Sequence, residues 1–594
     1  MARVPGLAAR ADWYLSRREY PPAEQLLREA AGILRLAGAD ENMMHAGVAS
    51  RLGAVLMRTN RASEAGHYLR QTLDIATRLL GPEHPDTTGA ARRVSWWHVS
   101  QGAYADALAA VEGALPGEDA WAGIAGDTAL AFDRHKSASD AILTDRLRIG
   151  LLTHLPGTDV LPAYGRLLRD RAREAALIDG APLARLGRVA TGRGESLTRL
   201  RRLRVQLAEG TLAGPVCVKP EVHLARLARW RDEERSIAAE FPPAPEVTPR
   251  AIANALPPDG TLVEFVRVIE ELDHEDRSRY AAFVLRAGAP DDVKLIDLGP
   301  AVEIDRLAGE WVALLANGNH ANESSWGNKV AKLLLAPLVP HLGANGELFV
   351  VADTGLRTLP FAALPTPKGD RLVNRFAVTL LTSAAALLDR RPVPERREPV
   401  VVATSNGGLF SWLKWMITGR VHSGAAVAAR LGVSPRDASG DWSRLLCDGV
   451  VHVAVPGALD AAPPLAPGKP LTRYVAPPAR YGASWGSLRL TAARLRDLRL
   501  TPGAVVVMPD TVPTAGPAGA EALTWVGRAF RQAGAGATIF GLWAQPDWAE
   551  YWGAFHDAVK AGTAPAEALR KAQLRAKKQG LPPSAWGGFV CVAG

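Results

Sequence analysis

The sequence is poor in cysteine, with only Cys217, Cys447 and Cys591 in 594 residues. These three residues lie far apart and form no CxxC pair, so neither a disulfide framework nor a thiolate metal site is indicated. The motifs HExxH and GxxxxGK[ST] are missing too, and we expect no metal and no cofactor. A chain with so few cysteines is predicted to work in a reducing compartment.

Long apolar runs are also missing. No stretch of about 18 uncharged apolar residues occurs, and arginines interrupt the apolar runs of the first twenty residues. We therefore expect neither a transmembrane segment nor a cleaved leader, and we predict a cytoplasmic protein. The chain is 47% hydrophobic and 22% charged, a composition typical of packed globular domains.

The net charge is +9. Most of the excess positive charge lies between Arg166 and Arg235, a stretch that contains 16 basic and 9 acidic residues. A basic stretch of this kind suits either a solvated helix face or a nucleic-acid surface. Its arginines alternate with acids such as Asp170 and Glu195, which weakens the field that phosphate binding needs. Nucleic acid is therefore an unlikely partner, although an adaptor that uses these helices stays open as an alternative.

A 42-residue repeat occupies the first part of the chain. Ala23, Ala65 and Ala107 are spaced by this period, and an apolar residue follows each of them four positions later. Small and apolar residues at fixed positions let paired helices approach and stack on the next pair, as in an α-solenoid. The segment LLGPEHPDTTGAARR makes the pattern similar to long tetratricopeptide (TPR) repeats. We therefore predict TPR-like repeats over 1–125.

The pattern stays helical over 126–241 but loses the period. LPAYGRLLRDRAREAALI, for example, places apolar residues at i, i+3 and i+4 with arginines opposite. We interpret this part as degenerate repeats in a basic helical region. Prolines then interrupt the chain, and a linker is expected over 242–250.

The periodicity changes again over 251–594. Short β-branched runs such as Thr261–Val268 and Arg279–Arg286 are followed by helical stretches and by further apolar runs, among them Val450–Val455 and Val505–Met508. Uninterrupted apolar strands that alternate with helices indicate a mostly parallel sheet covered on both faces. The predicted fold class is an all-α solenoid followed by an α/β domain.

Several segments of this second part resemble successive motifs of the CHAT domain, a caspase-like and separase-like peptidase family. They are GELFVVADTGLRTLPFAALP, RFAVTLLTSAAALL, GVVHVAVPG, AFRQAGAGATIFGLW and SAWGGFVCVAG. The resemblance runs from about Leu262 onward, and the family usually follows TPR repeats in bacterial proteins. It implies a histidine and a cysteine, each near the end of a strand, that together attack a peptide carbonyl.

Both positions depart from the family pattern. Pro456 stands where the histidine of the His-Gly pair is expected, and Asp510 stands where the cysteine is expected. His452 lies nearby, and we interpret it as a hydrogen-bonded core residue. None of the three cysteines lies at the end of the expected strand. The catalytic pair therefore looks lost.

Two other segments leave alternatives open. GASWG fits the G-x-S-x-G pattern around Ser484, which makes Ser484 an alternative nucleophile, but prolines precede it and a glycine-rich loop is expected instead. The tryptophan-rich segment Leu409–Val421 is interpreted as buried packing, with a partner or membrane patch as the alternative.

The resulting prediction is a TPR-CHAT pseudopeptidase that acts as a scaffold or regulatory subunit, with a partner protease or another effector as the protein beside which it would act. A protein or peptide ligand is expected on the concave face of the repeats. The resemblance associates the family with bacterial signalling and defence. An active hydrolase and a nucleic-acid adaptor are the alternatives.

Overall fold

The computed structural model divides the chain into two compact units. One comprises Met1–Glu246 with Val268–Arg279, and the other comprises Val247–Arg267 with Tyr280–Gly594. The structure describes 2–115, 131–178, 218–240, 246–269, 278–390, 398–403, 424–437, 449–461, 481–513, 517–543 and 549–593, apart from 40, 320, 456, 486–487, 492–494 and 496–499, and it describes a few positions between 195 and 206.

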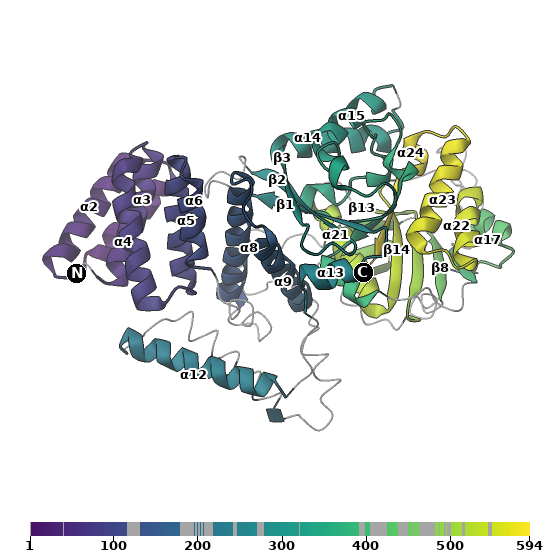
Figure 1. The fold of residues 1–594 in the computed structure, drawn as a ribbon. Helices are drawn as coiled ribbons and strands as arrows, with labels where there is room; N and C mark the ends of the chain where they lie inside the picture. Colours follow the sequence, from purple (N-terminus) through teal and green to yellow (C-terminus); the bar gives the residue numbers. More distant parts are fainter. Residues whose placement is uncertain are drawn as a thin grey trace. The chain divides into compact units, whose positions relative to one another are not determined.

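Three helical hairpins open the first unit (Figure 1). Ala23, Ala65 and Ala107 are each the fourth residue of a hairpin's second helix, and all three are fully buried. The predicted repeat is therefore confirmed. The hairpins are α1 (Val4–Ser16) with α2 (Tyr20–Leu36), α3 (Met43–Arg58) with α4 (Ala62–Leu80), and α5 (Pro85–Ser100) with α6 (Tyr104–Glu112).

The turn inside each hairpin repeats as well. Arg18, Asn60 and Gly102 lie 42 residues apart and have φ angles of 60°, 58° and 72°. In each turn, the N–H of the next residue donates to a carbonyl five residues earlier, as from Arg61 to Leu56 at 2.8 Å. The left-handed conformation ends the first helix and reverses the chain. Because one turn uses arginine and another glycine, residue identity alone does not reveal this repeat.

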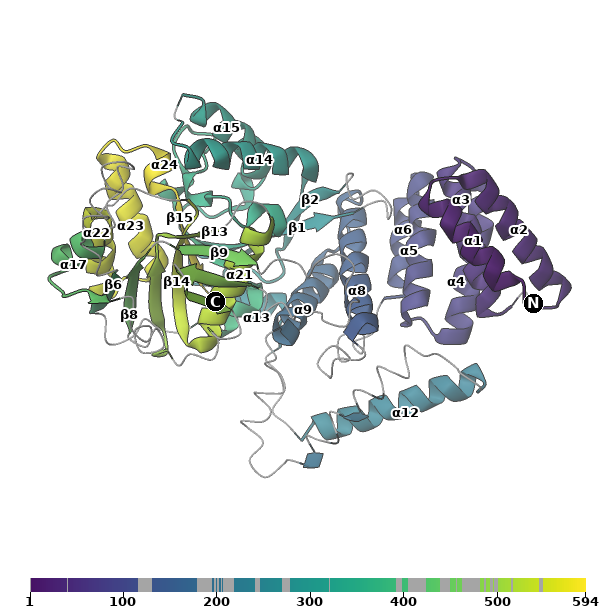
Figure 2. The same ribbon diagram turned by 180° about the vertical axis from the view of Figure 1, so that it is seen from behind.

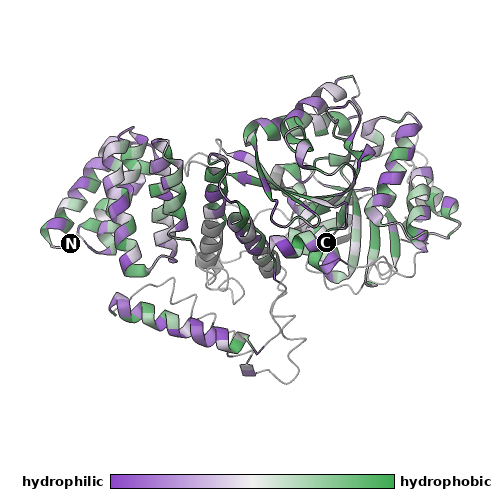
Figure 3. Cartoon of the chain, in the orientation of Figure 1, coloured by the Kyte–Doolittle hydropathy of each residue, from purple (hydrophilic) through white to green (hydrophobic). Residues whose placement is uncertain are grey.

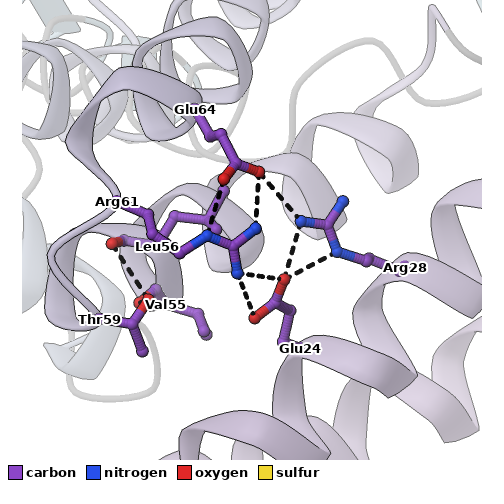
Figure 4. Close-up of polar contacts among 7 residues, drawn as sticks. All are labelled: Glu24, Arg28, Val55, Leu56, Thr59, Arg61 and Glu64. Atoms are coloured by element: carbon purple, nitrogen blue, oxygen red, sulfur yellow. Dashed lines mark hydrogen bonds and ion pairs between the residues drawn. The ribbon is translucent and has the colours of Figure 1, made fainter.

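Charged side chains connect the first two hairpins (Figure 4). Arg61 donates to both carboxylate oxygens of Glu24, at 2.9 and 3.0 Å, and to both of Glu64, at 2.7 Å each. Arg28 binds the same two acids, at 2.8 and 3.3 Å. Because the side chains of Arg61 and Glu64 are 40% and 46% exposed, the network orients the hairpins more than it stabilises them.

The basic region continues the helices of the first unit. One of these helices, α9 (Leu161–Ile178), has the same bounds as the predicted amphipathic segment. The structure also describes α8 (Ala131–Thr153) and α12 (Pro220–Ala238) in this region. Several of its arginines contact acids. Arg166 lies 3.0 Å from Asp145, and Arg231 lies 2.8 Å from Glu83. Such pairs leave less positive charge for a polyanion.

The predicted linker is shorter than expected. Pro249 and Arg250 form the first turn of α13 (Pro249–Ala255), and the hydroxyl of Thr248 accepts from the N–H of Ala251 at 3.2 Å. Proline is well suited to the first position of a helix because its missing N–H has no partner there anyway.

An eleven-stranded sheet forms the centre of the second unit, in the order β3-β2-β1-β4-β5-β15-β14-β12-β8-β6-β7. Parallel pairs join β1 through β15, and parallel pairs join β14 through β7, but β14 and β15 are antiparallel. The set β1, β4, β5 and β15 therefore runs opposite to the set β14, β12, β8, β6 and β7. The strands are β1 (Thr261–Val268), β2 (Arg279–Arg286), β3 (Lys294–Pro300), β4 (Gly346–Val351), β5 (Phe376–Leu381), β6 (Pro399–Ala403), β7 (Arg436–Asp437), β8 (Val450–Ala454), β12 (Ala504–Met508), β14 (Ala535–Gly541) and β15 (Phe589–Ala593).

Helices cover both faces of this sheet (Figures 1 and 2). Gly527 of α21 (Pro517–Ala533) lies against Val592 on one face, while α22 (Ala549–Lys560) contacts His452 on the other. The strands are largely hydrophobic, whereas the helices carry hydrophilic residues as well (Figure 3). The predicted α/β class is confirmed, as are β1 and β2 to the residue. The other helices are α14 (Ala301–Ala316), α15 (Glu323–Leu334), α17 (Gly424–Leu431), α23 (Pro565–Lys578) and α24 (Pro583–Trp586).

A second, four-stranded sheet was not expected from the sequence. Its order is β11-β10-β9-β13, and its strands are β9 (Gly457–Ala461), β10 (Tyr481–Trp485), β11 (Leu488–Thr491) and β13 (Thr511–Pro513). β9 follows closely on β8, and β13 follows closely on β12. This sheet therefore lies where the two strands expected to carry the catalytic pair end.

Candidate functional site

His452 lies within β8 and is fully buried. Its Nδ1 atom lies 2.9 Å from Nε2 of His556 on α22, and its ring packs edge-on against Trp552. Burial and the neighbouring His556 lower its pKa well below the ordinary value, so the ring is neutral. The predicted core histidine is confirmed. Its environment gives it no route to a substrate.

Asp510 follows the end of β12, and Pro456 follows the end of β8. These strands are adjacent and parallel, with Val507 paired to His452. Pro456 itself lies outside the described residues, but the next residue, Gly457, pairs with Thr511. Positions 456 and 510 therefore each come directly before one residue of the Gly457–Thr511 pair.

The chain forms further strands just beyond the ends of β8 and β12. An open α/β sheet usually leaves a crevice beyond the carboxyl ends of its strands. Here both strands continue into the second sheet, where Thr511 and Leu459 are fully buried. Asp510 stays partly exposed in the turn between the sheets. Backbone pairing between these two chain segments therefore continues past the ends of β8 and β12.

Cys591 is the one cysteine that the structure describes, and it is not placed to act as a nucleophile. It lies in β15, paired to Thr379 and Ile539 and 1% exposed. Burial is the main reason that the pKa of its thiol rises to about 12. A thiol is a weak nucleophile until it ionises, so Cys591 is inert at neutral pH. Cys217 and Cys447 lie outside the described residues.

Ser484 lies in the middle of β10, paired with Ala458 on one side and Arg489 on the other. The expected glycine-rich loop is therefore wrong, since GASWG forms an antiparallel strand. The G-x-S-x-G pattern needs a sharp turn from a strand into a helix, which exposes the serine. That turn is not present at Ser484. The segment Leu409–Val421 lies outside the described residues.

A hollow of about 480 Å³ lies at the other end of β12, next to Gly503, which precedes this strand, and Ala593, which ends β15. Its two arginines both contact acids: Arg390 lies 2.9 Å from Glu347, and Arg531 lies 3.4 Å from Asp389. Cys591, with its neutral thiol, also lines it. This hollow therefore lacks an activated nucleophile, and it is remote from Asp510.

A second hollow, of about 340 Å³, lies within the helical unit on helices α3 and α5. Arginine dominates its lining. It is lined by Leu15, Ser50, Arg51, Ala54, Arg58, Gly89, Arg92, Arg93, Trp96 and Leu143. Its volume lies within the range of about 300–1,000 Å³ that is usual for ligand clefts. Sequence reasoning placed a ligand on the repeats but did not identify these arginines.

Comparison with protein families supports both parts of the fold. A family model described as "CHAT domain" matches residues 325–593, and one described as "Tetratricopeptide repeat" matches 45–117. The chain thus combines tetratricopeptide repeats with a CHAT domain, as its motifs predict. The comparison with curated proteins gives no match.

Solved structures give distant similarities. A structure of nearly identical TPR-like repeats from Podosopora anserina is 14% identical, covers 40% of this chain and 96% of that chain, and has a TM-score of 0.21. The Saccharomyces cerevisiae separase–securin complex is 8% identical, with a TM-score of 0.34. That match covers all of this chain but 53% of the separase chain. Neither similarity is close enough to indicate a function.

Among the helices that the structure describes, none has the length and apolarity that crossing a bilayer requires. The described side chains of histidine, cysteine, aspartate and glutamate form no group of three or more that could hold a metal ion.

Proposed function

We propose that this protein is a catalytically deficient TPR-CHAT protein that works by binding other proteins. The repeats supply the binding surface, and the CHAT domain supplies a folded body without peptidase chemistry. Its role is that of a scaffold or regulatory subunit beside a protease or another effector, in bacterial signalling or defence.

The burial of His452 is the observation that carries this proposal. A general base must reach the proton that it abstracts, directly or through one water. The imidazole of His452 is enclosed by the core and contacts His556 instead. The histidine that the resemblance implies is replaced by a proline at 456, which has no proton to exchange. The cysteine that it implies is replaced by Asp510, whose carboxylate is a poor nucleophile toward an amide.

The hydrolase alternative has less support. Ser484 is paired on both sides within β10, and Cys591 is a buried neutral thiol. The nucleic-acid alternative also loses support from the acid partners of Arg166 and Arg231.

A cleavage assay tests the proposal. The full-length protein is incubated with a peptide library, and new peptide termini are measured by mass spectrometry, with papain as the positive control. We expect no cleavage by the wild type. We also expect none by Asp510→Cys, because the buried imidazole of His452 cannot activate the new thiol.

Cleavage by the wild type would contradict the proposal. If Ser484→Ala removed that activity, the hydrolase alternative would hold. If Asp510→Ala removed it, Asp510 would itself take part in catalysis. Affinity purification from the native host then identifies the proteins that bind the intact chain.

A further inference from the structure

Positive charge is concentrated on helix α23 of the CHAT domain (Figure 1). Its 14 residues include five basic side chains and one acidic side chain. Basic residues in the last turn stabilise the dipole of a helix, which accounts for Arg575, Lys577 and Lys578. The dipole effect falls off beyond that turn, so it does not account for Arg570 and Lys571.

Four of these cations surround one apolar side chain. Leu574 is half-buried and packs against the core of the domain. Arg570 and Lys571 precede it by four and three positions, and Lys577 and Lys578 follow it by three and four. Side chains at these spacings are neighbours on the surface of a helix. The five residues form the basic face of α23, which has an apolar centre inside a ring of cations.

The two exposed lysines of the basic face keep their charge available. Lys571 donates to the hydroxyl of Thr563 at 3.2 Å, which is a neutral acceptor. Neither Lys571 nor Lys578 forms an ion pair with any carboxylate in the described part of the chain. Arg570, in contrast, is paired with Glu567 at 3.1 Å. Lys571 and Lys578 can therefore bind acidic groups of a partner.

The other two cations of the basic face are held in place. Arg570 donates to the backbone carbonyl of Asn374 at 2.8 Å, and Lys577 donates to the side-chain carbonyl of the same residue at 2.6 Å. Burial lowers the pKa of Lys577, and the charges of Asp370 and Arg371 shift it in opposite directions. Side chains that are already fixed lose little entropy when a partner binds beside them.

We infer that the basic face of α23 binds an acidic amphipathic helix of a partner protein. An apolar centre inside a polar rim is typical of protein interfaces, and the side chains of two packed helices interdigitate. A helix with one leucine between glutamates at the same spacings matches this face in both charge and shape. The inference goes beyond the proposed function, because it gives the CHAT domain a binding surface of its own.

A protein partner fits this face better than a nucleic acid does. Helix α23 contains no aromatic residue on which a base could stack. The two exposed lysines are seven residues apart, which is about 10 Å along a helix, so few phosphates could reach them. Leu574 has no counterpart along a phosphate chain, whereas it can contact an apolar side chain of a helix.

Fluorescence polarisation with the full-length protein tests the inference. The probe is a fluorescein-labelled, alanine-based helical peptide with one leucine and with glutamates three and four positions before and after it. A matched probe has glutamine in place of the four glutamates, since glutamine and glutamate have similar helix propensities. We expect the glutamine probe to bind at least about tenfold more weakly, because each exposed ion pair changes affinity by up to about fivefold.

A third probe tests the apolar centre. It keeps the glutamates and has alanine in place of the leucine. We expect it to bind about threefold more weakly than the glutamate probe, because it buries less apolar surface against Leu574. Equal binding of these two probes would show that charge alone is recognised, and it would overturn the amphipathic partner.

Two double variants locate the site on the protein. Lys571→Gln with Lys578→Gln should weaken binding of the glutamate probe about tenfold. Both lysines are exposed, so the replacements leave the core intact. Lys329→Gln with Lys332→Gln is the matched control, because it removes the same charge from two exposed positions of α15. The affinity of the control should equal that of the wild type.

The remaining outcomes would contradict the inference. No binding of the glutamate probe, or an equal loss of affinity in the two double variants, would overturn it. Tighter binding of fluorescein-labelled oligouridine that the α23 double variant abolishes would overturn it in favour of nucleic acid. Each of these outcomes leaves the proposed catalytic deficiency standing, because that deficiency is measured separately by peptide cleavage.

Discussion

His452 and His556 are 104 residues apart in the chain, yet their ring nitrogens Nδ1 and Nε2 lie 2.9 Å apart in the core of the CHAT domain. Both rings are fully enclosed, and burial lowers the pKa of His556 to about 3. Two neutral imidazoles can share one hydrogen bond, whereas two imidazolium ions would repel each other. The histidine nearest to the expected catalytic position therefore serves the packing of β8 against α22.

This pair should make the CHAT domain sensitive to acid. The folded-state pKa values lie below the unfolded value of about 6.5, so the stabilisation is present above about pH 6.5 and is lost as the pH falls toward 3. The loss should approach about 1.4 kcal/mol per pH unit for each histidine. Urea unfolding at about pH 7.5 and 5.5 measures it. His556→Leu should reduce this dependence, and His67→Gln, at an exposed site on α4, should not. If the pH dependence of unfolding were unchanged in His556→Leu, the acid sensitivity could not be assigned to the buried histidine pair.

The helical unit should respond to pH in the opposite direction. Burial, the charge of Asp170 and a hydrogen bond with it raise the pKa of Asp145 to about 8, although Arg166 opposes the shift. An unfolded aspartate titrates near 3.9, so folding favours the protonated form, and stability falls as the pH rises from about 4 through 8. Asp145→Asn should make unfolding of this unit nearly independent of pH between about 6 and 9. Asp74→Asn, at an exposed site, should keep the pH dependence of unfolding that the wild type shows. If Asp74→Asn removed this pH dependence, a group other than Asp145 would be responsible for it.

The repeat turns predict opposite effects for two glycine replacements. Gly102 has a φ of 72° and open space around its Cα, so Gly102→Ala should destabilise the protein by about 1 kcal/mol through strain alone. Gly32 lies inside α2, also with open space, and Gly32→Ala should stabilise it by about 1 kcal/mol. Urea unfolding of both variants tests this. Equal effects of the two would show that φ at Gly102 imposes no strain.

A buried ion pair should be sensitive to the loss of one partner. Glu323 is 3% exposed; it accepts two hydrogen bonds from Arg371, at 2.8 and 2.9 Å, and one from the indole of Trp311 at 2.9 Å. Arg371→Ala leaves this carboxylate buried without its cation and should cost about 3–5 kcal/mol. Arg17→Ala, which removes an exposed pair with Glu19, should cost less than about 1 kcal/mol. Thermal unfolding compares the two, and a small loss for Arg371→Ala would mean that Glu323 takes up a proton instead.

Local pattern explains why parts of the fold could be predicted. The 42-residue period fixes which alanines face a neighbouring helix, because each helical position returns to the same environment when the hairpin repeats. The apolar runs of β1 and β8 likewise indicate buried strands, since a strand covered on both faces has no polar side. The proline at 456 and the aspartate at 510, which depart from the pattern that the resemblance implies, are also visible in the sequence, because they are a matter of residue type.

Tertiary structure decided the rest. The second sheet pairs Gly457 with Thr511 and Ser484 with Ala458, and strands from separate parts of the chain have no short-range pattern that reveals their pairing. The arginine-lined hollow depends on how α3 and α5 pack side by side. By itself, the sequence determined the residue types and their periods, and with them the fold class. Which side chains meet, and whether His452 faces solvent or the core, was decided by long-range packing, because contacts between distant segments depend on the whole fold.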